Sequence, residues 1–144
     1  MSRVWRPIEP VDPNMTRFWI TLDQGVRFVL ESIEAMSSGE IFVPKIPSMN
    51  IMDLSKALAP DCRVEFIGIR PGEKIHEVLV SEEEARHAIE LKDRFVILPL
   101  QTIQVSKSWP EGKALPNGFQ YTSENNIEQL VLDDLMNLIE SYIS

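Results

Sequence analysis

Apolar and polar positions along the chain predict one long amphipathic helix near the start. Thr21 and Gln24 have the spacing of a capping box, in which each side chain bonds to the backbone of the other residue. A helix is therefore expected to begin there, and Gly39 is a suitable stop. Its apolar residues recur at helical spacing and form one stripe, made of Leu22, Val26, Val29, Leu30, Ile33 and Met36.

Three further helices are predicted by the same local signals. Asn50 can cap a helix that Pro60 limits. Ser81 and Glu84 repeat the capping-box spacing, which predicts a short helix from Glu82 to about Glu90. The tail has a helical stripe that follows two acidic residues, and this stripe is made of Leu132, Leu135, Met136, Ile139 and Ile143.

Short apolar runs predict the strands. Residues 64–69 are expected to form a buried strand that stops at Arg70. Residues 40–46 predict an edge strand or strand end, because they contain a proline. Residues 75–80 predict a strand or a packed extended segment, and residues 94–98 predict another strand.

These elements predict an α/β fold with a small mixed sheet and three to four helices. Three prolines favour an extended lead-in over residues 1–14. Residues 15–144 are expected to form a single lobe, in which residues 100–126 are mostly loop.

Composition and charge narrow the class of partner. The formal charge of −8 over 144 residues argues against nucleic acid or an anionic membrane as the main partner. No apolar stretch approaches the length of a bilayer span, and the first residues contain no apolar signal core. The one cysteine, Cys62, excludes an intrachain disulfide. Together these features favour the cytoplasm.

The turn Arg70-Pro71-Gly72-Glu73 carries the candidate chemistry. Proline cannot donate to a ladder and glycine tolerates a positive φ, so the pair forces a turn at the expected strand end. The guanidinium of Arg70 offers a planar fork to phosphate oxygens, and Glu73 can accept from a sugar diol. The alternative interpretation is a hairpin with a solvated ion pair.

The sequence contains no convincing catalytic set. It has no Gly-x-Gly-x-x-Gly loop, no Gly-x-x-x-x-Gly-Lys-Ser/Thr loop and no Tyr-x-x-x-Lys pair. His76 and His87 lack a carboxylate pattern that suggests zinc, and both are expected to be solvated or core-edge residues. We therefore expect this chain by itself to bind neither a cofactor nor a metal.

Three ungapped blocks resemble a known family. The blocks are residues 15–21 (Met-Thr-Arg-Phe-Trp-Ile-Thr), residues 39–49 (Gly-Glu-Ile-Phe-Val-Pro-Lys-Ile-Pro-Ser-Met) and residues 67–77 (Ile-Gly-Ile-Arg-Pro-Gly-Glu-Lys-Ile-His-Glu). They are similar to the C-terminal part of the inverting UDP-N-acetylglucosamine 4,6-dehydratases, within the extended short-chain dehydrogenase/reductase superfamily. The likeness weakens over residues 100–126 and is poor before Met15.

The resemblance implies a substrate-binding C-terminal lobe without its Rossmann domain. In that family an NAD(P) cofactor, bound by the N-terminal domain, oxidises C4 of the sugar. Water then leaves across C5 and C6, and hydride returns at C6 with inversion at C5. Arg17 stands at the position of a nucleotide-sugar-binding arginine, and Arg70, Gly72 and Glu73 match a UDP-contacting turn.

Two hypotheses follow from the resemblance. In the first, the chain is a UDP-sugar-binding lobe that works beside a Rossmann-domain partner, with a second copy of the chain as the other candidate partner, or is the relic of a truncated gene. In the second, it is a non-catalytic protein-interaction module that kept the fold. The three matching side chains favour the first, and NAD(P) is then expected only in a complete enzyme.

We predict that the isolated chain forms no 4-keto-6-deoxy product from UDP-N-acetylglucosamine, with or without added NAD(P). The cofactor carries the hydride in this reaction. The motifs that would bind the cofactor and act with it are missing from this sequence. A discontinuous product assay on the pure protein tests this, and any product above the level of a protein-free control would contradict it.

Overall fold

The computed structural model describes residues 10, 12–100 and 109–143, and the chain in it forms two compact units. Unit 1 comprises Met1–Trp19, Pro47–Glu77 and Ser123–Ser144. Unit 2 comprises Ile20–Ile46 and Val78–Thr122. The expected division into a lead-in and one lobe stays a prediction, and most of the lead-in lies outside the described residues.

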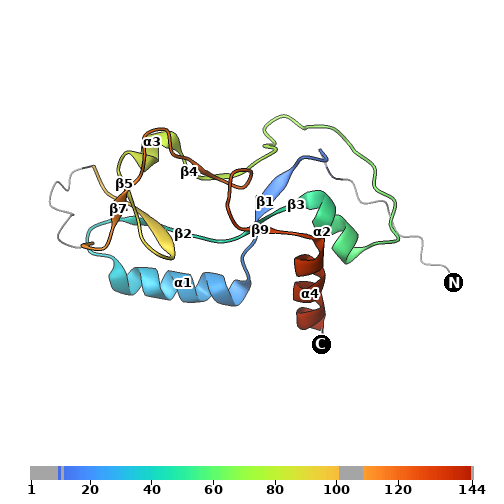
Figure 1. The fold of residues 1–144 in the computed structure, drawn as a ribbon, viewed down its shortest axis with the longest axis horizontal. Coiled ribbons are helices and arrows are strands. Elements are labelled where there is room, and N and C mark those ends of the chain that lie inside the picture. Colours follow the sequence, from blue (N-terminus) through green and yellow to red (C-terminus); the bar gives the residue numbers. More distant parts are fainter. Residues whose placement is uncertain (1–9, 11, 101–108, 144) are drawn as a thin grey trace. The chain divides into compact units, whose positions relative to one another are not determined.

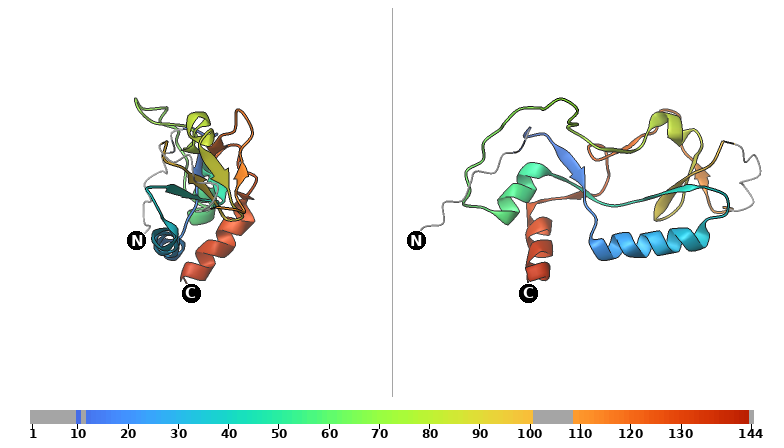
Figure 2. Two further views of the ribbon diagram at one scale, coloured as in Figure 1. Left: turned by 90° about the vertical axis from the view of Figure 1, so that its left-hand side faces the viewer. Right: turned by 180° about the vertical axis from the view of Figure 1, so that it is seen from behind.

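Unit 1 contains a three-stranded sheet and two helices. Its strands are β1 (Thr16–Phe18), β3 (Ser48–Asn50) and β9 (Gln129–Leu130), in the order β1-β3-β9. Strand β3 pairs antiparallel with β1 and parallel with β9. Helices α2 (Ile51–Leu58) and α4 (Leu132–Ile143) pack against each other, as Figures 1 and 2 show. The buried side chains of Met15, Met49 and Leu135 form the apolar core of this unit.

Unit 2 is built on an antiparallel sheet of order β2-β6-β5-β7. These strands are β2 (Ile41–Pro44), β5 (Ala88–Glu90), β6 (Arg94–Ile97) and β7 (Lys113–Ala114). Strands β4 (Val78–Val80) and β8 (Tyr121–Thr122) form a separate antiparallel pair, and helices α1 (Leu22–Ala35) and α3 (Glu82–Ala85) complete the unit.

The core of unit 2 gathers around β6, whose four residues are all buried. The Phe95 ring packs against the rings of Phe119 and Tyr121, with centroids 5.4 and 5.0 Å away. The Tyr121 hydroxyl donates to the carbonyl of Ile46 and accepts from its N–H, at 2.8 and 3.0 Å. A buried phenol needs such partners, so this aromatic cluster also determines the course of the chain after β2.

Local signals in the sequence predicted several elements correctly. Both capping boxes form, at Thr21 with Gln24 and at Ser81 with Glu84. The Asn50 side chain accepts from the N–H of Met52 and caps α2. Strand β2 is an edge strand, strand β6 lies within residues 94–98, and α4 occupies the tail as expected. The four helices and small sheets of the described residues confirm the predicted α/β class.

Other predictions were wrong. Residues 64–69 form no buried strand: Phe66, Ile67 and Ile69 are exposed, and Gly68 has a φ of +77°, which interrupts the extended backbone. Only the first half of the helix expected up to Glu90 exists. The second half is strand β5, because its backbone groups pair with β6 and β7. Helix α1 ends at Ala35, about one turn before Gly39.

The shortest strands were missed. No strand was assigned to β1, β3 or β9, and residues 100–126 were expected to be mostly loop although they contain β7 and β8. Each of these strands has two or three residues. Alternation cannot be recognised over so few positions, so only the pairing partner defines them.

Glu40 closes the connection between α1 and β2. Its Oε2 accepts from the N–H groups of Ser37 and Ser38 at 3.0 and 2.8 Å. Burial raises the pKa of this carboxyl, but backbone N–H groups of Ser38, Glu40 and Ser37 lower it, and the net effect is a pKa below its ordinary value of 4.5. The ionised form is therefore favoured by folding.

We predict that Glu40→Gln destabilises the protein at pH 7 and that the difference shrinks in acid. Because folding lowers this pKa, the ionised carboxyl stabilises the folded protein at pH values above its ordinary pKa of 4.5. This stabilisation is lost as the pH falls through the pKa of the folded state. Urea unfolding from pH 7 down to pH 3 measures the difference. The exposed Glu34→Gln on α1 is the control and should stay within about 0.5 kcal/mol of wild type at pH 7. A difference that does not depend on pH would contradict the assignment.

Candidate functional site

The segment 70–73 forms a hydrogen-bonded turn on the surface of unit 1. The N–H of Glu73 donates to the carbonyl of Arg70 at 3.0 Å. Pro71 occupies the second position and Gly72, with a φ of +85°, the third, which is the arrangement of a type II turn. The predicted Pro-Gly turn is confirmed. A Cβ at Gly72 would meet no neighbour within 4 Å, so backbone conformation alone explains the glycine.

Glu73 supports the turn from its side chain. Its Oε2 accepts from the N–H of Arg70 at 3.2 Å. One side-chain and one backbone hydrogen bond between Arg70 and Glu73 therefore hold the turn. Among the described residues the guanidinium of Arg70 makes neither a hydrogen bond nor an ion pair. The alternative of a solvated ion pair between these two side chains therefore does not describe the turn. Arg70 presents its donors to solvent.

Arg17 lies on β1 and bonds to the chain that directly follows the turn. Its Nη1 donates to the carbonyls of Thr16 and Ile75 at 2.7 and 3.0 Å, and its Nη2 donates to the carbonyl of Lys74 at 3.0 Å. Its Nε lies 3.9 Å from Oε1 of Glu77. The guanidinium is thus mostly engaged within the protein. The structure places Arg17 beside the segment that carries Arg70, Gly72 and Glu73, as a support for that segment.

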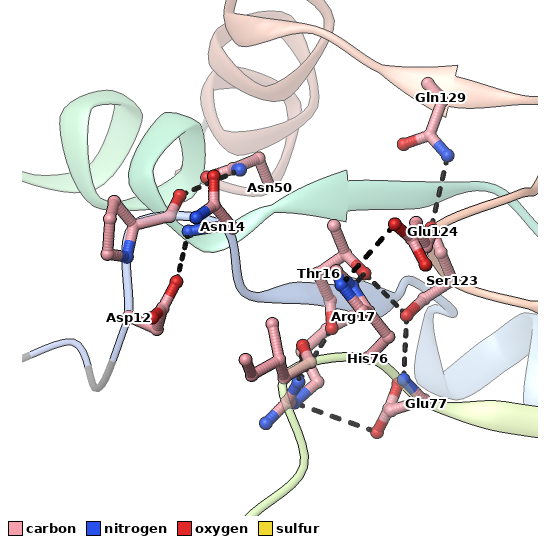
Figure 3. A network of polar contacts seen from close by, with 12 residues as sticks. Asp12, Asn14, Thr16, Arg17, Asn50, His76, Glu77, Ser123, Glu124 and Gln129 are labelled. Atoms are coloured by element: carbon pink, nitrogen blue, oxygen red, sulfur yellow. Dashed lines mark hydrogen bonds and ion pairs between the residues drawn. The ribbon is translucent and has the colours of Figure 1, made fainter. Parts of the chain in front are cut away.

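A chain of hydroxyl and imidazole groups joins three segments of unit 1 (Figure 3). The N–H of Glu77 donates to Oγ of Ser123 at 2.9 Å, and Oγ of Ser123 lies 2.7 Å from Oγ1 of Thr16. The Thr16 hydroxyl lies 2.8 Å from Nδ1 of His76, whose Nε2 faces Oε1 of Glu124 at 3.7 Å.

The following assignment of donor directions satisfies the groups in this chain. Ser123 already accepts from a backbone N–H, so its single proton is free to donate to Thr16. Thr16 then donates to Nδ1 of His76, and the Nε2 proton points toward Glu124. The hydroxyls of Ser123 and Thr16 and Nδ1 of His76 each have a hydrogen-bond partner under this assignment, which suits the complete burial of Ser123.

This network is a structural support and has no features of a catalytic triad. The Ser123 hydroxyl is fully buried, and Glu124 is largely exposed at a distance too long for a hydrogen bond. The sequence pattern predicted that His76 is a solvated or core-edge residue, and its half-buried position agrees with the second alternative. Ser123 and Glu124 were missed because they lie more than 45 residues from their partners Glu77 and His76, and no local pattern connects them.

Two further features of the described residues bear on function. They contain no group of three or more His, Cys, Asp or Glu side chains that could hold a metal ion. None of the helices in the described part of the chain has the length and apolar character needed to cross a membrane.

Comparison with known proteins identifies relatives of the chain. Residues 5–99, which include Arg17 and the turn, match the family described as polysaccharide biosynthesis protein. A UDP-N-acetylglucosamine 4,6-dehydratase (inverting) of Campylobacter jejuni is 43% identical over 122 residues, which are 80% of this chain and 36% of the relative. A UDP-glucose 4-epimerase of Rickettsia rickettsii is 34% identical over 133 residues, covering 89% and 39%.

A solved structure shares the fold. The X-ray structure of Pen from Bacillus thuringiensis superposes with a TM-score of 0.79 at 30% sequence identity, covering 95% of this chain and 42% of Pen. The chain thus spans about two fifths of the length of these relatives. Together the matches confirm the resemblance read from the three sequence blocks.

We predict that Ser123→Ala destabilises the protein by about 1–3 kcal/mol, because it leaves the buried N–H of Glu77 and the Thr16 hydroxyl without a partner. Urea unfolding measures the cost, and the NMR signals of the His76 ring should shift with it. Ser141→Ala removes an exposed hydroxyl on α4 and is the matched control, expected within about 0.5 kcal/mol. Equal stability of the two variants would show that the network does not hold the segments together.

Proposed function

Because the chain belongs to the family described as polysaccharide biosynthesis protein, we propose that it is the UDP-sugar-binding lobe of a dehydratase-type enzyme. The catalytic machinery, with its NAD(P) cofactor, then belongs to polypeptide outside this chain. The observation that carries the proposal is the guanidinium of Arg70, which has no hydrogen bond or ion pair to the described residues and lies at the end of a turn closed by two hydrogen bonds.

The names of the relatives support uridine diphosphate as the shared ligand chemistry. One relative acts on UDP-N-acetylglucosamine and another on UDP-glucose, so the sugars differ and the nucleotide does not. A guanidinium suits a diphosphate, since its planar fork donates two parallel hydrogen bonds to phosphate oxygens. The turn therefore supplies a phosphate contact, and Glu73 offers its remaining carboxylate oxygen to a hydroxyl group of the ligand.

The structure suggests distinct roles for the four predicted substrate-binding residues. Arg70 is the direct ligand contact in this proposal. Gly72 permits the positive φ of the turn, and Glu73 closes it. Arg17 positions the backbone of the following residues, and its remaining donor capacity is small. A half-site of this kind is pre-organised before the ligand arrives, which lowers the entropic cost of binding.

No residue of this chain is proposed to hold NAD(P). In the described residues the glycines with positive φ stand singly, at Gly39, Gly68, Gly72 and Gly118, and none directly precedes a helix. A dinucleotide-binding loop needs clustered glycines that open onto a helix N-terminus. The described residues contain no such loop. Action in the cytoplasm also belongs to this proposal and is supported by the single cysteine of the sequence.

The second candidate function is a protein-interaction module. The observation that favours it is the large exposed apolar surface of α1, formed by its stripe of six residues between Leu22 and Met36. The two functions differ in their response to nucleotide, because an interaction module has no reason to bind UDP.

We predict that UDP binds the isolated chain with a dissociation constant of about 1 mM, roughly 4 kcal/mol, since only part of the natural enclosure is present. Arg70→Ala removes a charge-assisted contact and should cost about 1.5–3 kcal/mol, which makes binding undetectable. Arg63→Ala is the matched control, because Arg63 is also an exposed arginine in the same segment. NMR chemical shifts on adding UDP provide the measurement.

The same titration separates this proposal from its alternatives. Glu73→Gln should weaken binding of UDP and leave binding of inorganic phosphate nearly unchanged, because the expected partner of Glu73 is a hydroxyl group. If UDP moves no signal between Arg63 and Val80, or moves them equally in the Arg70→Ala protein, the nucleotide-binding function is wrong.

A further inference from the structure

The segment 74–77 directly follows the turn and attaches it to unit 1. The carbonyls of Lys74 and Ile75 accept from the guanidinium of Arg17, at 3.0 Å each. The Ile75 carbonyl also accepts from the N–H of Thr16 at 3.0 Å. The bonds that hold the turn in unit 1 therefore begin one residue after the turn ends.

His76 adds a side-chain anchor to this segment. Its Nδ1 lies 2.8 Å from Oγ1 of Thr16, and that hydroxyl lies 2.7 Å from Oγ of Ser123 (Figure 3). The next residue, Glu77, donates its N–H to the same Ser123 oxygen at 2.9 Å. Two neighbouring residues of the segment thus meet one pair of hydroxyl groups. The direction in which these hydroxyls donate decides what the imidazole must be.

The burial of Ser123 decides that direction. Its side chain is fully buried, and among the described residues its Oγ contacts the N–H of Glu77 and the hydroxyl of Thr16. If Thr16 donated to Ser123, the Ser123 proton would have no acceptor in the interior, which is costly. Ser123 therefore donates to Thr16, and Thr16 donates to the imidazole. Nδ1 of His76 must then be an acceptor, and the ring carries its proton on Nε2.

The far side of the ring agrees with this tautomer. Nε2 of His76 faces Oε1 of Glu124 at 3.7 Å, and a carboxylate favours a proton on the nitrogen that faces it. This contact is too long for a hydrogen bond, and the Glu124 side chain is 67% exposed. The hydrogen bond from Thr16 is therefore the contact that orients the imidazole.

We propose that His76, with Nδ1 as an acceptor, is a positioning residue for the turn that carries Arg70. The bond from Thr16 holds the ring, and with it the segment 74–77, against β1. The turn then keeps one orientation relative to unit 1, which lowers the entropic cost of binding a diphosphate. This inference rests on the proposed function, because the affected ligand is UDP at Arg70. It extends that function to a residue outside the turn.

Two amide substitutions at His76 separate the roles of the two ring nitrogens. The side-chain oxygen of Asn can occupy the position of Nδ1, whereas the polar atoms of Gln extend to the position of Nε2. In an NMR titration with UDP, His76→Asn should keep the affinity within about twofold of wild type, whereas His76→Gln should weaken it about fivefold, which corresponds to one lost hydrogen bond. A role in packing alone predicts the opposite order, because Asn fills less of the ring volume. Equal affinities, or the opposite order, would overturn the proposal.

Two measurements without nucleotide test the positioning role by itself. At pH 8, where free imidazole is neutral, the ¹⁵N chemical shifts of the His76 ring should show a bare Nδ1 and a protonated Nε2. Amide hydrogen exchange at Glu73 and Glu77 should be severalfold faster in His76→Gln than in His76→Asn. A protonated Nδ1, or equal exchange in the two variants, would overturn the proposal.

The control is His87→Gln, the same substitution at an exposed histidine of unit 2, and it should change neither UDP affinity nor exchange at Glu73 and Glu77. If His76→Gln does not fold, the ring tautomer and the affinity of His76→Asn decide the proposal, and a fivefold loss in His76→Asn would overturn it. If UDP does not bind wild type, the proposed function and the ligand named here are wrong. The two measurements without nucleotide then still decide whether His76 positions the turn.

Discussion

The buried hydroxyl of Ser123 is the interaction on which unit 1 depends most, because this unit is assembled from three stretches of chain that are distant in sequence. One hydroxyl contacts the other two stretches, accepting from the backbone of Glu77 and bonding to the side chain of Thr16. Arg17 strengthens the same junction by donating to the carbonyls of Lys74 and Ile75. Hydrogen bonds between buried polar groups are costly to leave unmade, so these contacts and the β1-β3-β9 sheet, which takes one strand from each stretch, together define how the stretches meet.

The position of the turn at residues 70–73 depends on that junction. Residues 70–73 are exposed and contribute little apolar burial, so the turn cannot be located by packing. Its internal geometry comes from Pro71, Gly72 and the carboxylate of Glu73, and its attachment to unit 1 comes from the bonds of Arg17 to the two residues that follow it. Arg17 supports the backbone beside Arg70, and its contact with a nucleotide sugar stays a prediction.

Unit 2 combines a well-packed interior with an open exterior. Around β6 the aromatic rings of Phe95 and Tyr121 pack closely, and Arg94 holds one face of α1. The stripe on the other face has no cover among the described residues. This contrast is what a part of a larger assembly would show, since a helix selected for a fully solvated position would carry polar residues there.

The sequence by itself determined the features that depend on neighbours within about four residues. Both capping boxes, the Asn50 cap and the Pro71-Gly72 turn form as predicted, because each is a hydrogen bond or a dihedral preference that short separations decide. The three sequence blocks likewise sufficed to recognise the family.

Tertiary structure decided everything that needs a distant partner. Residues 64–69 are apolar enough for a strand, yet only Val64 forms a bridge and Gly68 has a positive φ. Residues 88–90 follow a helical cap, yet they pair with β6 and β7. Periodicity showed that α1 has an apolar face. Which side of the helix packs against the protein depends on its hydrogen bond with Arg94, some sixty residues away in the sequence. Side-chain pattern reports what a segment can bury, and only long-range contacts settle what it does bury.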